Sequence, residues 1–254
     1  MTRCCVLPHL VADGPRNMAL DEALLDAVAA DPTAAVVRTY AWSTPTLSLG
    51  YFQAYAEVEA DPRWRGHPVV RRPTGGGALW HDREVTYAVV VPADHPLARP
   101  STALYRAIHG AIGACLREAG VAAGRRGDGP IAADVPGDRP FLCFRDRDDD
   151  DVVAGAIKLV GSAQRRRAGA VLQHGSLLLA RSPTTPELPG LVDLAGPAAA
   201  GDDPVATWGA ICRQVLPDLL GGETIWRDFE DRERERADEL SREIYESDRW
   251  TRRR

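Results

Sequence analysis

The sequence contains almost no lysine. Of its 31 lysine and arginine residues a single one, Lys158, is a lysine. Either side chain keeps its charge on a solvated surface, so a chain that otherwise uses arginine has a local reason for lysine here. Arginine cannot supply a compact ammonium with three donors and a pKa that burial can lower. Survival of one lysine through compositional drift is the alternative interpretation. A cysteine upstream at Cys143, and the Gly-Ser-Ala and His-Gly-Ser segments around the lysine, favour a functional role.

The sequence also lacks the cysteine patterns of disulfide frameworks and zinc sites. Its five cysteines form no CxxC pair, their number is odd, and no histidine-rich spacing accompanies them. We therefore predict no bound metal and mostly reduced thiols. Each cysteine is most simply interpreted as a small core residue, and the helical spacing around Cys115 assigns that cysteine to the core.

Neither an excess of basic residues nor a long apolar run is present. The formal net charge is −5, whereas nucleic acids and anionic membranes attract proteins with a basic face. No apolar run reaches the roughly 18 residues that a membrane-spanning helix needs, and the first residues lack the apolar core of a signal peptide. We predict a cytoplasmic protein that binds neither nucleic acid nor membranes.

The length of 254 residues and the apolar content of 44% fit one large domain or two small ones. Apolar residues at helical spacing predict helices, and β-branched residues between turn signals predict strands. The predicted helices are residues 17–30, 101–119, 205–216 and 229–245. The predicted strands are residues 36–40, 46–49, 69–72, 78–80, 85–91, 156–164 and 170–179.

Several arrangements of these elements follow from the turn residues between them. Residues 69–91 are expected to form an antiparallel meander, and residues 156–179 a hairpin around 165–169. Strand alternation predicts Lys158 and Val160 on one face and Leu159 on the other. Residues 122–139, rich in Gly, Pro, Asp and Arg, predict an exposed loop. The acidic run at residues 148–151 is interpreted as a solvated loop and not as a metal site.

A glycine-rich segment follows the strand at residues 69–72. Gly75, Gly76 and Gly77 allow positive φ angles and bring main-chain N–H groups close to a ligand. The segment is neither a P-loop nor a GxGxxG motif, and a plain hairpin turn is the alternative interpretation. Two arginines before the glycines and His81 after them form a denser cluster than a turn requires.

The segments RRPTGGGALWHD, KLVGSAQRRRAGAVLQHGSLLL and YESDRW resemble the biotin/lipoate protein ligase superfamily. Within it, the chain is most similar to the lipoate-ligase-like octanoyltransferases, and the similarity begins at NMALDEALL and YAWSTPTLSLGYFQ. The resemblance implies an α+β fold, with a mixed, mainly antiparallel sheet packed against helices. It also implies an acyl chain held in a tunnel and a single catalytic domain over residues 1–254 that includes the helix at 229–245. The chain departs from the family at residues 145–151, where RDRDDDD replaces a short segment with Tyr-Glu-like residues.

The resemblance implies an enzyme that moves octanoate from acyl carrier protein to a lysine of an apo lipoyl domain, such as the glycine-cleavage H protein. Cys143 would carry the acyl thioester, Lys158 would contact the acyl carbonyl, and no cofactor would be needed. The implied substrate-binding residues are Arg71, Arg72, Thr74, Gly75, Gly76, Gly77, Ala78, His81, Gly161, Ser162, Ala163, His174, Gly175 and Ser176.

Acyl transfer from a thioester needs a nucleophile that can be a thiolate near pH 7, which explains why a lysine would lie beside the cysteine. A free cysteine has a pKa of about 8.5, and an ammonium about 4 Å away favours the thiolate by roughly 1 to 4 kcal/mol. The same ammonium polarises the carbonyl, and N–H groups of the glycine segment or near Gly161 are candidate oxyanion donors.

Three other functions share parts of this pattern. An ATP-dependent lipoate-protein ligase would need ATP and Mg²⁺ but no cysteine, because it activates a free carboxylate. A binding module that holds an acyl chain without transferring it would use the same glycine segment and apolar strands. An amidotransferase that moves octanoyl groups between lipoyl proteins is a third alternative, although its motifs differ from GSAQ and LQHGS.

Overall fold

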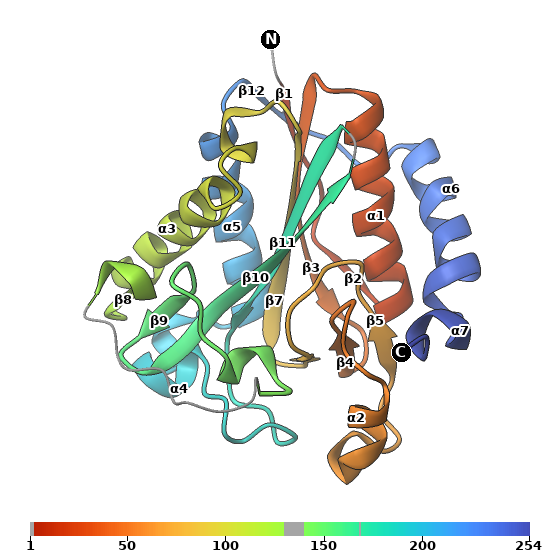
Figure 1. The fold of residues 1–254 in the computed structure, drawn as a ribbon. Coiled ribbons are helices and arrows are strands. Elements are labelled where there is room, and N and C mark those ends of the chain that lie inside the picture. The colour runs from red at the N-terminus through yellow and green to blue at the C-terminus, as the bar shows by residue number, and fades with distance from the viewer. Residues whose placement is uncertain (1–2, 130–139, 168) are drawn as a thin grey trace.

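The structure is a computed structural model that describes residues 3–129, 140–167 and 169–254. Its centre is a large mixed sheet with helices on both faces (Figure 1). The strand order is β12-β1-β3-β7-β11-β10-β9-β8, with β2 beside β3. These strands are β1 Arg3–Val6, β2 Leu10–Ala12, β3 Ala34–Trp42, β7 Glu84–Pro92, β8 Ala123–Arg125, β9 Val152–Ala154, β10 Ile157–Arg167, β11 Ala170–Leu178 and β12 Glu223–Trp226.

Most neighbouring strands in this sheet are antiparallel. The pairs β3–β7, β7–β11, β10–β11, β9–β10 and β8–β9 are antiparallel, whereas β1 pairs with β3 and β12, and β2 with β3, in parallel. The predicted α+β class with a mixed, mainly antiparallel sheet is therefore confirmed, as is the hairpin of β10 and β11.

A small second sheet contradicts the meander predicted over residues 69–91. Its order is β5-β4-β6, formed by Val69–Arg71, Thr46–Leu49 and Leu79–His81. β5 and β6 both pair with β4, whereas β7 leaves this group and joins the large sheet between β3 and β11. Every residue of β7 is buried. A strand buried on both faces needs partners and cover on both sides, which a meander of short strands does not supply.

Helices lie on both faces of the large sheet (Figure 1). α1 Gly14–Ala30 lies on one face, with α6 Asp231–Leu240 packed against it, and α3 Ala103–Glu118 and α5 Pro204–Leu220 lie on the other. Short helices at the edges are α2 Ala56–Ala60, α4 Leu191–Ala195 and α7 Asp248–Thr251. A π-helical turn, Ser241–Tyr245, extends α6, so the helix predicted at 229–245 is present from residue 231 onward.

Local signals explain where these helices begin. The Asp13 side chain accepts a hydrogen bond from the Arg16 N–H at 2.9 Å at the start of α1, and Asp203 accepts one from Ala206 at 3.0 Å at the start of α5. A proline follows each cap, where its missing N–H has no helical partner to lose. The other three predicted helices are confirmed, with α5 extending further at its C-terminal end than residues 205–216.

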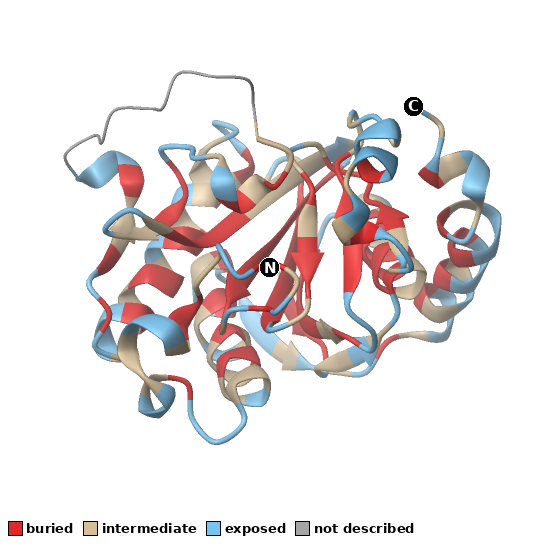
Figure 2. Ribbon diagram, turned by 90° about the horizontal axis from the view of Figure 1, so that it is seen from below, coloured by how far each residue is buried: buried red, intermediate tan, exposed pale blue. Residues whose placement is uncertain are grey.

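Strand alternation divides the interior into two apolar layers. Val89 and Val91 of β7 pack toward α3 and α5, whereas Ala88 and Val90 pack toward α1. Figure 2 shows buried residues along the strands and exposed residues on the outer sides of the helices. None of the helices in the described ranges has the length and apolar character that crossing a lipid bilayer requires.

The alternation predicted around Lys158 is wrong. The register between β10 and β9 shifts between Lys158 and Val160, so that Leu159 and Val160 are both fully buried in the layer beneath α3. A bulge of this kind changes which way a neighbouring side chain points.

The loop predicted over residues 122–139 is partly wrong. Residues 123–125 form β8 and Arg126–Asp128 a 3-10 turn, while residues 130–139 lie outside the described residues. In the hairpin predicted around 165–169, the three arginines remain in β10 opposite Ala170, Val171 and Leu172, and residue 168 is not described.

Two glycines in ordered positions give a matched test of this packing. A Cβ atom at Gly190 would lie 2.4 Å from the Ala180 backbone N and 2.5 Å from the Leu179 carbonyl carbon. We expect Gly190→Ala to lower the free energy of unfolding by about 1–3 kcal/mol, because backbone atoms cannot move aside as a side chain can. A Cβ at the exposed Gly110 in α3 would meet nothing within 4 Å. Gly110→Ala should therefore raise the free energy of unfolding by about 0.5–1 kcal/mol. Urea unfolding measures both, and equal effects of the two substitutions would contradict this packing.

Candidate active site

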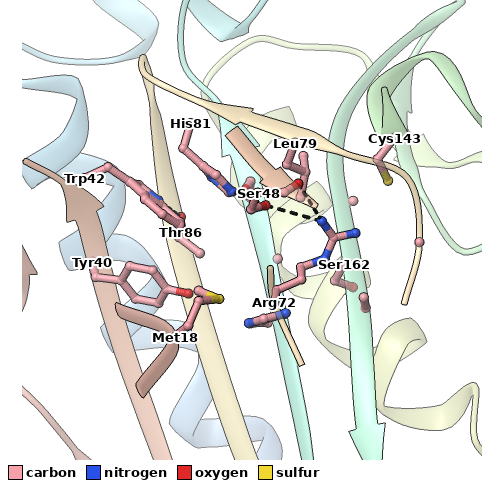
Figure 3. A pocket seen from close by; sticks show the side chains of 16 residues that line it. Met18, Tyr40, Trp42, Ser48, Arg72, Leu79, His81, Thr86, Cys143 and Ser162 are labelled. Atoms are coloured by element: carbon pink, nitrogen blue, oxygen red, sulfur yellow. Dashed lines mark hydrogen bonds between the residues drawn. The ribbon is translucent and has the colours of Figure 1, made fainter. Parts of the chain in front are cut away.

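A cavity lies between α1, the large sheet and the small sheet (Figure 3). The space between these elements, including its opening to solvent, is about 420 Å³. Its wall is formed by Met18, Tyr40, Trp42, Ser48, Arg72, Gly76, Leu79, His81, Thr86, Cys143, Gly161, Ser162, Ala163, His174, Gly175 and Ser176.

One side of the cavity is aromatic and apolar. Figure 3 shows Trp42, Tyr40 and Met18 on the side away from Cys143. The Trp42 ring stacks on His81 with ring centroids 3.8 Å apart. Its indole N–H donates to Thr86 Oγ1 at 3.0 Å, and the Tyr40 hydroxyl donates to Asp21 at 2.9 Å. The polar atoms of both rings are thus paired. His81 covers one face of Trp42 and Arg38 lies over one face of Tyr40, so only the opposite faces are left to contact a hydrocarbon.

His81 is held from both ring nitrogens. Its Nδ1 lies 2.7 Å from Glu84 Oε1 and its Nε2 lies 2.7 Å from Ser48 Oγ. A carboxylate can only accept, so the proton on Nδ1 points at Glu84. Burial opposes the charge of Glu84, but His81 and the Thr86 hydroxyl outweigh it and lower the pKa of this carboxyl. His81 is thus an oriented part of the wall.

The Arg72 guanidinium holds the glycine segment in place by hydrogen bonds to its carbonyl oxygens. It donates to the carbonyls of Gly75 at 2.8 Å and Gly77 at 2.6 Å, and to the Ser48 carbonyl at 3.1 Å. Burial lowers the pKa of Arg72 to about 10, so it stays charged at neutral pH. Gly76 has a φ of 90°, which favours glycine.

The glycine segment docks on the turn that carries Cys143. The Ala78 N–H donates to the Phe141 carbonyl at 2.7 Å, and the Cys143 N–H donates to the Ala78 carbonyl at 2.8 Å. A Cβ at Gly77 would lie 3.0 Å from the Cys143 N, so a side chain there would push the two segments apart. Because the Cys143 N–H is already used, it is not free to act as an oxyanion donor.

Cys143 and Lys158 are brought together. Cys143 lies in a half-buried 3-10 turn, Cys143–Arg145, and Lys158 Nζ is 3.7 Å from its Sγ. The amine also donates to the Cys143 carbonyl at 3.2 Å and the Asp146 carbonyl at 3.3 Å, and it forms an ion pair with Asp151 at 2.7 Å. Lys158 is 6% exposed and lies against the cavity-lining Gly161, where an added Cβ would be 3.0 Å from Nζ.

The charge of Lys158 is stabilised in place. Burial opposes the ammonium, but the interactions with Cys143 and Asp151 outweigh burial and raise the pKa of Lys158 above its ordinary value. What lysine provides at this position is therefore a compact, permanent charge and not a lowered pKa.

The interpretation of residues 148–151 as a solvated loop is wrong for its second half. Asp148 and Asp149 are exposed, but Asp150 and Asp151 are 8% and 4% exposed. Asp151 pairs with Lys158, and Asp150 accepts from Arg106 at 3.1 Å and Arg125 at 2.9 Å. A carboxylate is buried when cationic partners offset its desolvation, and these partners come from distant parts of the chain.

Ser162 is hydrogen-bonded toward α3. Its Oγ lies 2.8 Å from His109 Nε2, and the Tyr87 hydroxyl lies 3.1 Å from the same nitrogen. His109 Nδ1 contacts the Asp150 carbonyl, so Nδ1 carries the proton and Nε2 accepts. Burial lowers the pKa of His109 to about 4, which keeps the ring neutral. His109 was not predicted, because in the sequence it falls on a helix among core residues.

Ten of the predicted site residues line the cavity. They are Arg72, Gly76, His81, Cys143, Gly161, Ser162, Ala163, His174, Gly175 and Ser176. Lys158 lies directly behind this wall. Among the others, Arg71 donates to the carbonyls of Gly50 and Thr251 and links the small sheet to α7. Thr74 lies 2.7 Å from His174 Nε2, whose Nδ1 is 2.7 Å from the fully buried Asp21. Gly75, Gly77 and Ala78 shape the segment from outside the wall.

Six wall residues were missed. Met18, Tyr40, Trp42, Ser48, Leu79 and Thr86 all fall on predicted helices or strands or beside them. From sequence they resemble core residues, because a cavity between two sheets is lined by the same apolar faces that would otherwise pack together. In the part of the chain that the structure describes, no group of three or more His, Cys, Asp or Glu side chains is arranged to hold a metal ion.

Curated relatives are similar to a large part of the chain. The octanoyltransferases LipM of Moorella thermoacetica and Kyrpidia tusciae are 44% and 43% identical to it over 179 and 171 residues. The match covers 66% of this chain in both cases, and the chain spans 62% of the length of these relatives.

Solved structures share the fold over nearly the whole chain. A lipoate-protein ligase A bound with ATP matches with a TM-score of 0.75 at 22% identity, covering 99% of both chains. A bipartite lipoate protein ligase from Thermoplasma acidophilum matches with a TM-score of 0.71 at 21% identity, covering 99% of this chain and 96% of that one.

The family model described as the lipoyl protein ligase A/B catalytic domain matches residues 13–185, which is more than half of the chain. These residues include the small sheet, the strands of the large sheet from β3 to β11, and the cavity with Cys143 and Lys158. The chain therefore belongs to the lipoyl protein ligase A/B catalytic domain family.

Proposed function

We propose that this protein is an octanoyltransferase, which moves an octanoyl group from acyl carrier protein to a lysine of an apo lipoyl domain through a thioester on Cys143. The observation that carries the proposal is the 3.7 Å contact between Cys143 Sγ and the buried Lys158 ammonium at the wall of an apolar cavity. The names of the LipM relatives support the same activity.

The first half-reaction loads the enzyme. The Cys143 thiolate, stabilised by Lys158, attacks the carbonyl carbon of the donor thioester, and negative charge develops on the carbonyl oxygen. An ammonium held beside this oxygen stabilises that charge without reorganising. The intermediate collapses by breaking the donor carbon–sulfur bond, and the released thiolate takes a proton from water. The octanoyl chain then lies against the Trp42, Tyr40 and Met18 side of the cavity.

The second half-reaction transfers the octanoyl group from Cys143 to the acceptor lysine. The neutral amine of the acceptor lysine attacks the Cys143 thioester, the new carbon–nitrogen bond forms, and the carbon–sulfur bond breaks. The electron pair returns to Sγ as a thiolate, and the extra proton of the amine passes to water. The apo glycine-cleavage H protein is the acceptor that we propose to test first, and a cytoplasmic location stays a prediction.

The ATP-dependent ligase alternative differs in what activates the acyl group. A ligase must activate a free carboxylate with ATP, whereas a thioester donor is already activated, so the proposed transfer needs no cofactor. The ATP-bound ligase with the same fold keeps this alternative open to test. The position of Cys143 on the cavity wall beside Lys158 favours the transferase.

Removal of the thiol should abolish the covalent intermediate. After incubation with octanoyl-acyl carrier protein without ATP, intact-mass analysis of the wild type should show one octanoyl adduct, and Cys143→Ala should show none. Cys115→Ala is the matched control, because Cys115 lies in α3 and packs against the core. An undiminished adduct on Cys143→Ala would refute the assignment. A wild type without adduct that attaches free octanoate or lipoate only with ATP would establish the ligase instead.

Replacement of the lysine should slow acylation even when the charge is kept. Lys158→Arg places a larger planar group between Asp151 and Gly161, where the amine already lies 3.0 Å from the position of a Cβ. We expect the acylation rate to fall by about 10²–10³-fold, the range for losing one well-placed oxyanion donor. Arg145→Lys, an exposed exchange in the same turn, should leave the rate unchanged. Rapid-quench mass spectrometry measures both rates, and near wild-type acylation by Lys158→Arg contradicts this role of the lysine.

A further inference from the structure

Asp151 is held by its carboxylate, its main-chain N–H and its main-chain carbonyl. Its carboxylate forms the 2.7 Å ion pair with Lys158 Nζ and accepts the Asp148 N–H at 2.7 Å. Its own N–H donates to the Asp148 carbonyl at 3.1 Å, and its carbonyl accepts the Arg126 N–H at 2.9 Å. The side chain is 6% exposed and would lie 3.6 Å from a Cβ at Gly161. A carboxylate fixed in this way keeps its position whatever happens at Cys143.

The charge around Lys158 changes during the proposed reaction. The Lys158 amine contacts the Asp151 carboxylate and Cys143 Sγ. In the proposed loading step this sulfur attacks as a thiolate, so two anions lie beside the ammonium before acylation. Acylation converts the thiolate into an uncharged thioester, so one of these anions disappears. A buried ammonium without an anion in contact loses its proton or its position, because burial penalises the charged form. Asp146 contributes a weaker attraction, and the neutral His109 ring contributes no negative charge.

We propose that Asp151 is a positioning residue that keeps the Lys158 ammonium charged and in place after Cys143 has been acylated. Its contribution therefore falls on the transfer of the acyl group to the acceptor amine and not on the loading of Cys143. This inference rests on the proposed thioester at Cys143 and deepens it, because it assigns separate anions to the two half-reactions.

The transfer step explains why the charge is needed at that stage. When the neutral amine attacks the thioester, negative charge develops first on the carbonyl oxygen and then on Sγ as the carbon–sulfur bond breaks. Lys158 lies 3.7 Å from Sγ and can stabilise both only while it is protonated. In the loading step the attacking thiolate is itself the counter-ion of Lys158, so Asp151 is not required for its charge.

Asp151→Asn tests this division. The amide has nearly the same shape, and its oxygen can still accept the Asp148 N–H, but it carries no charge. We expect loading by octanoyl-acyl carrier protein to stay within about threefold of the wild type, and transfer to an apo lipoyl domain to fall by about 10²-fold, comparable to the loss of an oxyanion donor. The octanoyl adduct should therefore accumulate in the variant during turnover. Both rates are measured in single turnovers by rapid quench and intact mass.

Asp149→Asn is the matched control, since Asp149 is the exposed neighbour that pairs with Arg126 at 3.2 Å. It should leave both half-reactions unchanged. A purely structural role of Asp151 predicts that loading and transfer fall together, and that result, or unchanged transfer, overturns the inference. A wild type that forms no adduct contradicts the proposed function itself and is therefore distinguishable.

Asp151→Glu carries the test should the asparagine variant fail to fold, as judged by thermal unfolding. It keeps the negative charge one methylene further out, so we expect loading and transfer each to stay within about threefold of the wild type, whereas a purely structural role predicts that both rates fall together by at least about tenfold. A transfer rate lost at least tenfold more than loading, although the charge is retained, would contradict the proposal. Loading lost tenfold more than transfer would do so as well.

Discussion

The contact of one buried ammonium with the Asp151 carboxylate and the Cys143 thiol organises the centre of this structure. Lys158 reaches its position from a bulge in β10, Cys143 from a 3-10 turn, and Asp151 from the acidic segment that leads into β9. A charge buried this deeply is stable only if opposite charges and carbonyl oxygens replace its water. The three segments are thus fixed by the same requirement, and the reactive thiol is positioned by the arrangement that satisfies the lysine.

Two glycines make this contact sterically possible. At Gly161 a side chain would occupy the space taken by the Lys158 methylene and amine, with a Cβ only 2.6 Å from Cε. At Gly77 a Cβ would collide with the backbone of Cys143. Arg72 then closes the glycine segment over the cavity by binding two of its carbonyls. The glycine segment therefore closely approaches the backbone of the turn that carries Cys143. The expectation that its N–H groups face a ligand stays a prediction.

The sequence predicted features that depend on the type or spacing of residues within one segment. It did not predict features that depend on which other segment of the chain packs against them. The uniqueness of Lys158 drew attention to a residue that is buried and paired in the structure, although its pKa is raised and not lowered. Apolar spacing predicted the main helices. The meander predicted over residues 69–91 is wrong because β5 and β6 both pair with β4, a strand outside that range. The solvated acidic loop failed because the cations that bury Asp150 and Asp151 lie elsewhere in the chain. Met18, Tyr40 and Trp42 could not be separated from core residues, since lining a cavity and filling a core require the same apolar side chains.

The polar groups of the cavity wall are largely paired with one another, and this pairing determines how a ligand can lie. His81 is bound by Glu84 and Ser48, Trp42 by Thr86, and Tyr40 by Asp21. Polar groups that are already hydrogen-bonded to protein partners have few donors or acceptors left for a polar ligand. They also lose no hydrogen bond when a hydrocarbon displaces the water beside them. Under the proposed function, an acyl chain therefore lies on the aromatic side, where the polar atoms of Trp42 and Tyr40 are already paired. Its carbonyl, the one polar part, is matched at the opposite side of the cavity, where the thiol of Cys143 lies beside an ammonium. Under the proposed function, this distribution of paired and reactive groups along the wall orients the acyl chain with its reacting carbon at the sulfur.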